Sequence, residues 1–164
     1  MDVKKIYSAM HREYGSQGWW PLSKGRLQTN HHCGPPKDSH DQWEIIVGAC
    51  LTQNTSWSNV EKAIENLNRA ELLRIENIIK APESRIAELI RPAGYFNQKA
   101  ERLKLIADYF SEHFRDRTVP SRDDLLAVKG IGPETADSIL LYAFGQPYFV
   151  VDAYTRRIFS RLGL

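Results

Sequence analysis

The chain has few cysteines and little net charge. Its 164 residues include two cysteines, Cys33 and Cys50, which are too few for a disulfide framework or a four-cysteine metal cluster. The formal net charge of +2 is too small to indicate nucleic-acid binding by itself. The sequence also lacks an apolar run of membrane-spanning length and a basic-then-apolar N-terminal signal. We therefore expect a cytoplasmic protein that makes no membrane contact.

The composition is that of an ordinary globular domain. Hydrophobic residues make up 42% and charged residues 26%, and the length suits one domain or two small lobes with a shared core. Charge is uneven along the chain, because residues 153–164 carry Arg156, Arg157 and Arg161 and no acidic residue. This basic end is compatible with contacts to phosphates and also with a solvated surface.

Apolar residues recur with a helical period along most of the chain, and no alternating strand pattern of useful length occurs. We predict helices at residues 2–14, in the apolar segment 43–51, at 58–67 with Ser58 as N-cap, at 82–90 with Pro82 in the first turn, and at 97–114. The run PYFVV at 147–151 is short enough to be extended. The sequence predicts an all-α fold of many short helices.

Residues 22–41 are polar, rich in breakers and without apolar periodicity, so we predict a loop. The loop contains His31, His32, Cys33 and His40, whose spacing matches no known metal-ligand pattern. We expect no metal site there.

Two of the four tryptophans lie in the segment GWWPL at 18–22. Trp19 and Trp20 could cap a hydrophobic core. A flat aromatic wall beside the rigid Pro21 would also grip a flat ring by stacking.

The segment VKGIGPETA at 128–136 places Gly130 and Gly132 between two helical patterns, with Pro133 as first residue of the second helix. Such a turn directs backbone N–H groups outward beside a helix N-terminus, where phosphate binds. Asp152 follows at the start of the last predicted helix, in VVDAYTRRI. It could be an N-cap or, beside the apolar Val150 and Val151, a carboxylate in a partly dry environment.

These motifs resemble a known family. The segments KGIGPETAD and FGQPYFVVDAYTRRI are similar to the helix-hairpin-helix and catalytic-aspartate region of the endonuclease III superfamily of DNA glycosylases. GWWP, GACLTQNTSWSNVEKAIENL and RPAGYFNQKAERL resemble, in the same order, the 3-methyladenine DNA glycosylase III branch. The likeness covers most of residues 18–164. The loop at 22–41 is longer than in that branch.

The resemblance implies an all-α helix-hairpin-helix DNA glycosylase fold, with two lobes flanking the active-site cleft. Residues 1–20 would begin the lobe of the terminal helices, and residues 41–164 would form the helical bundle. The hairpin would lie near 121–145 and the catalytic aspartate helix would start at 152. Relatives continue past Leu164, so the resemblance implies a missing C-terminal part, with lowered stability or self-association of the exposed face. Otherwise a monomer is expected.

The resemblance also assigns roles to individual residues. Asp152 would be the catalytic acid, Gln53 would fill the gap left by an extruded nucleotide, and Tyr95 would wedge the opposite strand, although core packing is an equal alternative for Tyr95. Contacts to DNA phosphates are assigned to Lys129, Gly130, Ile131, Gly132, Arg156 and Lys99. For Lys99 a solvated helix position is the alternative. The carbonyls near Val128 and Ile131 would hold a monovalent cation.

The base pocket follows from the same resemblance. Trp19, Trp20 and Pro21 would form one side and Trp57 the other, sandwiching a cationic 3-alkyladenine. Glu134 occupies the position where bifunctional members carry a Schiff-base lysine, and a carboxylate cannot form an imine. We therefore expect a monofunctional glycosylase that acts on alkylated purines in double-stranded chromosomal DNA, with no iron–sulfur cluster. The alternatives are a same-fold enzyme for mismatched or oxidised pyrimidines and a non-catalytic DNA-binding module.

Overall fold

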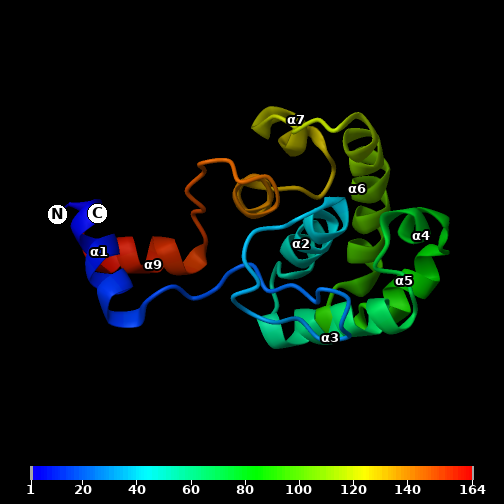
Figure 1. The fold of residues 1–164 in the computed structure, drawn as a ribbon, viewed down its shortest axis with the longest axis horizontal. Coiled ribbons are helices and arrows are strands. Elements are labelled where there is room, and N and C mark those ends of the chain that lie inside the picture. The colour runs from blue at the N-terminus through cyan, green and yellow to red at the C-terminus, as the bar shows by residue number, and fades with distance from the viewer. Residues whose placement is uncertain (1, 164) are drawn as a thin grey trace.

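The computed structural model describes residues 2–163, and within them the architecture is helical (Figure 1). The elements in chain order are α1 (Val3–Tyr14), α2 (Ser39–Leu51), α3 (Trp57–Arg69), α4 (Ile75–Lys80), α5 (Glu83–Leu89), the 3-10 turn η1 (Arg91–Ala93), α6 (Phe96–Asp116), α7 (Arg122–Ala127), α8 (Pro133–Ser138), the π-helical turn η2 (Ile139–Ala143) and α9 (Ala153–Arg161). In the described chain the one β feature is an isolated bridge between Leu22 and Asn30. The all-α prediction is confirmed.

The bundle from α2 to η2 is built around α2, which is buried along nearly its whole length. The sequence explains this position, because the segment IIVGACL has no polar face to offer to water. The helix α2 packs on η2 and on the long helix α6, and α6 in turn packs on α4 and α5. Fully buried side chains in this core include Trp43, Ile64, Leu103 and Phe110.

In the view of Figure 1 the helices α1 and α9 both project to one end of the molecule, away from the bundle. Neither contains a buried residue. Tyr7, Tyr14 and Tyr154 are each about two-thirds exposed. None of the helices between Asp2 and Gly163 is both long enough and apolar enough to cross a membrane.

Two local predictions need correction. The N-cap of α3 is Ser56, and Ser58 lies inside the helix, because α3 already begins at Trp57. The polar segment is helical from Ser39 onward, since the Asp38 side chain accepts the N–H of Asp41 and starts α2 before the apolar run. The rest of 22–41 is irregular, and so is 145–152, which contains PYFVV and pairs with no strand in the described residues.

The long loop is fixed to α2 by two carboxylates. Glu44, fully buried, accepts hydrogen bonds from the backbone N–H and the hydroxyl of Ser23, at 2.6 and 2.7 Å. Burial raises the pKa of the Glu44 carboxyl, and the hydrogen bonds from Ser23 only partly oppose this. Asp41 pairs with Lys24 and accepts the N–H of Lys37 at 2.9 Å. These contacts hold the segment that follows Trp19 and Trp20 against the bundle.

Candidate functional site

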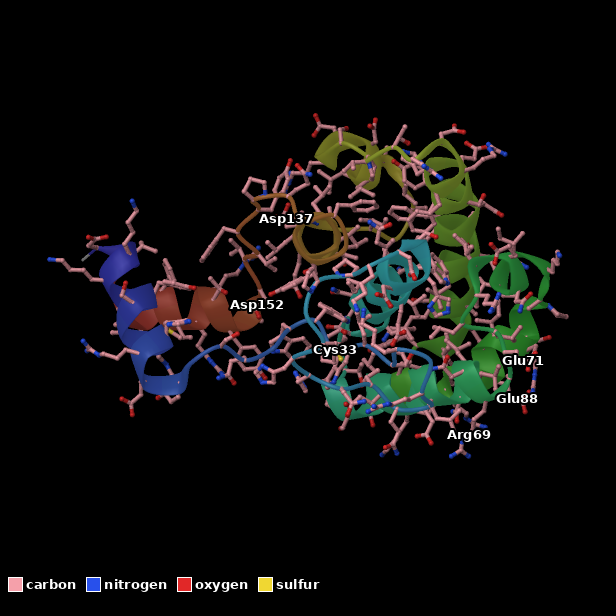
Figure 2. The ribbon with its side chains drawn as sticks, viewed as in Figure 1. Cys33, Arg69, Glu71, Glu88, Asp137 and Asp152 are labelled. Carbon is pink, nitrogen blue, oxygen red and sulfur yellow. The ribbon has the colours of Figure 1, made fainter. Side chains whose placement is uncertain are left out.

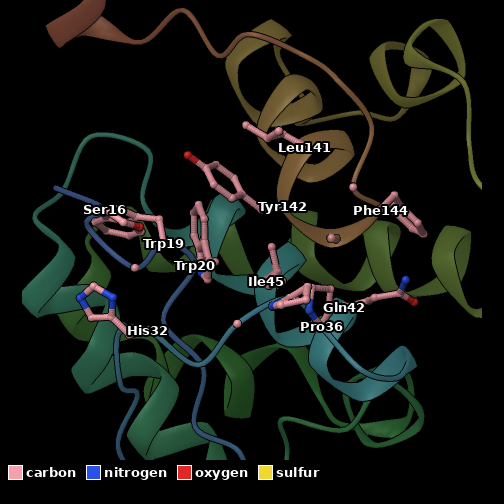
Figure 3. Close-up of a pocket in the computed structure, with 15 residues that line it drawn as sticks. Ser16, Trp19, Trp20, His32, Pro36, Gln42, Ile45, Leu141, Tyr142 and Phe144 are labelled. Atoms are coloured by element: carbon pink, nitrogen blue, oxygen red, sulfur yellow. The ribbon is translucent and has the colours of Figure 1, made fainter. Parts of the chain in front are cut away.

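An aromatic cavity of about 690 Å³ lies between the tryptophan segment, α2 and η2. Its lining includes Trp19, Trp20, Tyr142, Phe144, Gln42 and Pro36. Figure 3 shows Trp20 and Tyr142 beside each other at the cavity, with the Tyr142 hydroxyl pointing away from Ile45. Their ring centroids are 5.3 Å apart. The cavity therefore offers flat π-surfaces together with one phenol hydroxyl.

Trp20 reaches this position because α2 carries a glycine beneath it. A Cβ atom at Gly48 would lie 2.8 Å from the indole Nε1 of Trp20, too close for any real side chain. Trp20 is only 9% exposed, while Trp19 is about half exposed at the cavity mouth. The glycine thus sets how deep the indole of Trp20 sits.

The predicted sandwich of indoles around a base is wrong for this conformation. Trp57 meets Trp19 and Trp20 edge-on, with centroid distances of 5.0 and 5.5 Å and interplanar angles of 76° and 89°. Two parallel rings with a base between them would lie about 7 Å apart. Pro21 is buried, and neither Pro21 nor Trp57 lines the cavity. Trp57 instead supports the other two indoles from the side.

Tyr142 is a cavity residue that sequence reasoning missed. It lies in the π-helical turn that directly follows α8, and such turns occur frequently at functional sites. Burial raises the pKa of the Tyr142 phenol, and the negative charge of Asp152 raises it further. The phenol therefore lies within electrostatic reach of that carboxylate. A π turn has no reliable sequence signal, so only its place after the hairpin could have suggested it.

Asp152 lies at the junction between the bundle and α9 (Figure 2). Its Oδ1 accepts the backbone N–H of Thr155 at 2.6 Å, so it is the N-cap of α9. The side chain is half-buried. Of its two apolar neighbours, Val150 is half-buried and Val151 is 41% exposed, so the environment of Asp152 is only partly dry. In residues 2–163 no donor meets the second carboxylate oxygen, which leaves it available for chemistry.

A second cavity, of about 550 Å³, lies at the hairpin between α7 and α8. Its lining combines the hairpin residues Gly130 to Thr135 with Gln53, Asn54, Arg102, Ala153 and Arg156. Ala153 directly follows Asp152, so the start of α9 borders the hairpin cavity. Two arginines at this cavity give it the charge that a phosphate needs.

The two hairpin glycines serve different purposes. Gly130 has a φ of 98°, and a Cβ there would lie 2.6 Å from the Arg102 side chain, so no other residue suits the turn. A Cβ at Gly132 would meet no atom within 4 Å. The turn is closed by the Ile131 N–H, which donates to the Val128 carbonyl at 3.1 Å. Gly132 therefore leaves its backbone open to a close approach by a ligand.

Gln53 and Glu134 both lie at this hairpin. The Gln53 side chain donates from Nε2 to the hydroxyl of Thr135 at 3.0 Å. Glu134 is half-buried and lines the hairpin cavity, although it was predicted for the base pocket. Glu134 thus lies at the hairpin cavity and does not line the aromatic cavity.

Tyr95 and Lys99 are in opposite environments. Tyr95 is 67% exposed in a left-handed conformation (φ 47°), which excludes ordinary core packing. Lys99 is only 4% exposed, and its ammonium donates to three backbone carbonyls. The prediction of a phosphate contact by Lys99 is therefore wrong, and so is the solvated alternative. Burial, reinforced by the charge of Arg102, lowers the pKa of the Lys99 ammonium.

The remaining predictions concern Lys129 and the possible metal ligands. Lys129 is exposed and pairs with Glu101 at 2.6 Å. Within residues 2–163 no three His, Cys, Asp or Glu side chains are arranged to hold a metal, and this includes His31, His32, Cys33 and His40. Burial raises the pKa of Cys50 to about 12, so its thiol is a poor ligand. Cys33 and Cys50 do not suit an iron–sulfur cluster.

The candidate site thus combines a glycine hairpin beside two arginines, an aromatic cavity and the carboxylate of Asp152, an arrangement that suits the helix-hairpin-helix class of proteins. Residues 47–164 match the model of the HhH-GPD superfamily of base excision DNA repair proteins. The chain belongs to this family.

Individual relatives agree with the assignment. The chain is 43% identical to the "Putative DNA repair glycosylase MJ1434" of Methanocaldococcus jannaschii, covering 99% of this chain and 70% of that protein. It is 33% identical to endonuclease III of Thermotoga maritima, over 75% of this chain and 57% of that one.

Among solved structures, the Helicobacter pylori 3-methyladenine DNA glycosylase MagIII bound to 1,N6-ethenoadenine superposes with a TM-score of 0.76 and 32% identity. The match covers 98% of this chain and 72% of that one. The recognised resemblance and the helix-hairpin-helix glycosylase fold are thus confirmed.

Proposed function

We propose that this protein extrudes an alkylated purine such as 3-methyladenine from duplex DNA and hydrolyses its N-glycosidic bond without cutting the strand. One observation carries the proposal: an aromatic cavity and a glycine hairpin flanked by two arginines lie on the same helical bundle, and the half-buried Asp152 directly precedes Ala153, which lines the hairpin cavity. The likeness to MagIII, a 3-methyladenine DNA glycosylase, supports the choice of base.

DNA would dock at the hairpin. Gly132 leaves room for the backbone of one strand, and Arg102 and Arg156 flank the cavity there. Lys129 and the backbone N–H groups near Ile131 would add phosphate contacts, and the carbonyls near Val128 and Ile131 would hold a monovalent cation that reduces repulsion.

Extrusion costs a few kcal/mol, because stacking and pairing are lost. The exposed Tyr95 would wedge one strand while Gln53, now bonded to Thr135, would turn into the gap. The flipped base would lie against the indoles of Trp19 and Trp20 and the ring of Tyr142. A cationic base gains about 0.5–2 kcal/mol on such a face.

Bond breaking leaves positive charge at C1′, and the bonding electrons pass to the departing base, which becomes neutral. The free oxygen of Asp152 would stabilise that cation and then take the proton of the water that attacks C1′. A neutral base would need an acid to leave; an alkylated adenine needs none. This difference favours the alkylpurine over mismatched or oxidised pyrimidines.

Strand cleavage requires an amine at the sugar. Glu134 occupies the position where bifunctional members of the family carry the Schiff-base lysine. The ammonium of Lys99 donates to three backbone carbonyls, and that of Lys129 pairs with Glu101. In the described chain no lysine lines the hairpin cavity. This arrangement supports a monofunctional enzyme.

The test is a release assay on duplex DNA that carries methylated purines, with Asp152→Asn as control. We expect free 3-methyladenine from the wild type, little from the variant, and strand breaks only after alkali. Breaks without alkali would contradict the monofunctional proposal. Tight, salt-sensitive binding without release would favour a DNA-binding module.

A further inference from the structure

One buried ammonium joins the two segments that we assign to opening the duplex. Lys99, in the first turn of α6, donates from Nζ to the carbonyl of Leu51 at 2.9 Å, to that of Gln53 at 2.8 Å and to that of Ala93 at 2.8 Å. An ammonium has three N–H donors, so all of them are used. The side chain lines neither cavity.

Each acceptor lies at the end of a helix or in the turn that follows. Leu51 is the last residue of α2 and Ala93 the last of η1, and terminal carbonyls have no partner within their own helix. The negative end of α2 also favours a cation there. Gln53 is the candidate gap filler, and the candidate wedge, Tyr95, follows Ala93 by two residues.

Both segments contain a non-glycine residue in a left-handed conformation. Asn54, next to Gln53, has a φ of 56°, and Tyr95 has a φ of 47°. Such conformations are strained and persist where the surroundings enforce them. The Lys99 ammonium binds the carbonyl of the residue directly before Asn54 and that of the residue two before Tyr95.

We propose that Lys99 is a positioning residue for duplex opening: its ammonium fixes the spacing of Gln53 and Tyr95, so that filler and wedge enter the DNA as one unit. This inference rests on the proposed function, since it assumes that these two side chains open the duplex. Lys99 would act on extrusion and leave bond breaking at C1′ unchanged.

The same helix offers a matched control. Lys104, five residues later in α6, donates from Nζ to the carbonyls of Ile79 at 2.8 Å and Ala81 at 2.6 Å. It also secures the end of a helix, α4, but it contacts neither candidate segment. A general requirement for lysine–carbonyl contacts would affect both residues.

The experiment compares Lys99→Arg with Lys104→Arg. The substitution keeps the charge, but a planar guanidinium fork does not match three converging carbonyls. The probe is a duplex with 2-aminopurine beside an alkyladenine nucleotide whose 2′-fluoro group blocks hydrolysis. One duplex pairs that nucleotide with thymine, and a second leaves it unpaired. Fluorescence on titration reports opening, and thermal unfolding confirms that each variant folds.

We expect Lys99→Arg to raise the midpoint of the fluorescence titration about tenfold or more on the paired duplex. The increase should be smaller on the unpaired duplex, where extrusion costs less. Lys104→Arg should match the wild type on both. The effect of Lys99→Arg should also be non-additive with that of Gln53→Ala, because Lys99 acts through that residue.

Equal losses on both duplexes, additivity with Gln53→Ala, or the same defect in Lys104→Arg would overturn the inference. If Lys99→Arg does not fold, Lys99→Met with the same two duplexes replaces it. A wild type that opens the 2′-fluoro duplex but releases no base from hydrolysable methylated DNA in the release assay would contradict the proposed function alone, and the Lys99 comparison would still decide the inference. A wild type that opens neither duplex overturns both.

Discussion

The bundle and the terminal helices are stabilised to very different degrees. The bundle from α2 to η2 contains the entire buried hydrophobic core beyond Trp20 and Leu22, whereas α1 and α9 contain no buried residue. The cavities, the hairpin, Gln53 and Tyr95 all belong to the bundle or its edge. Asp152 caps the first turn of α9, at the boundary between the two regions.

Because of this difference in packing, most residues proposed to bind DNA lie in the well-packed bundle, whereas the proposed catalytic carboxylate lies at the start of the poorly packed α9. Apart from Arg156 on α9, the residues that would grip and open DNA belong to elements held by core packing, so their backbone geometry is set before DNA arrives. The carboxylate depends on the N-cap bond to Thr155 and on the few contacts of α9. Changes at Asp152 should therefore alter chemistry with little effect on folding, and changes in the bundle should do the reverse.

The largest effect is expected for Asp152→Asn. The amide keeps an oxygen for the N-cap bond, since Asn is as good a cap as Asp, but it lacks the charge for the C1′ cation. We expect single-turnover base release to fall by about 10²–10⁴-fold. Thermal unfolding should shift little. Unaltered release would remove Asp152 from the mechanism.

Two substitutions to alanine, one in the bundle and one in α9, test the contrast in stability between these two regions. Leu103→Ala removes a fully buried side chain from α6 and should cost about 2–5 kcal/mol of unfolding free energy. Ile158→Ala in α9, where the side chain is 37% exposed, should cost much less. Urea unfolding of both variants gives the comparison. Similar costs would show that α9 is packed as firmly as the bundle.

Gly48→Ala should damage the base pocket from within the bundle. The added methyl group meets the Trp20 indole, which cannot retreat because Trp57 and Tyr142 pack against it. Overpacking of this kind costs about 1–3 kcal/mol. We expect a higher KM for base release with nearly unchanged binding of undamaged duplex. Normal kinetics would mean that Trp20 does not form the pocket wall.

The sequence was most informative where a local pattern determines structure. Helical periodicity predicted the all-α fold, and Gly130, Gly132 and Pro133 predicted the hairpin, because a positive φ and a helix start leave few alternatives. Asp152 was recognisable as an N-cap from its place before AYTRR. These features depend on residues close together in the chain.

Features that depend on long-range packing could not be predicted. The burial of Lys99 follows from carbonyls 46 and 48 residues away, and periodicity alone suggested a solvated lysine. The edge-on contact of Trp57 depends on where α3 lies relative to the tryptophan segment. Tyr142 reaches the cavity through a π turn, which shifts the helical register that the sequence pattern assumes.

The attachment of the long loop gives a pH-dependent prediction. Burial by itself raises the pKa of the Asp41 carboxyl, but hydrogen bonds from Lys24 and Lys37 and the charge of Lys24 lower it overall. A carboxyl with a lowered folded-state pKa stabilises the fold above its unfolded-state pKa, near 3.8, and the stabilisation is lost as pH falls through the folded-state value.

Asp41→Asn should therefore cost about 1–2 kcal/mol at neutral pH, where the charge is present. The difference from the wild type should shrink once the pH falls below about 4. Urea titrations at several pH values measure it. A constant difference across this range would mean that the Lys24 pair does not depend on the charge of Asp41.

The smallest effect is expected for Arg156 in α9, and it concerns the salt dependence of DNA affinity. Arg156 lines the hairpin cavity, whereas its neighbour Arg157 stacks over Tyr154 at 5.0 Å. If Arg156 contacts a phosphate, Arg156→Ala should reduce the slope of log affinity against log salt concentration by about one. Arg157→Ala should leave the slope unchanged. Equal slopes for both variants would place the phosphate contacts on the bundle alone and leave α9 with Asp152 as its sole contribution to the site.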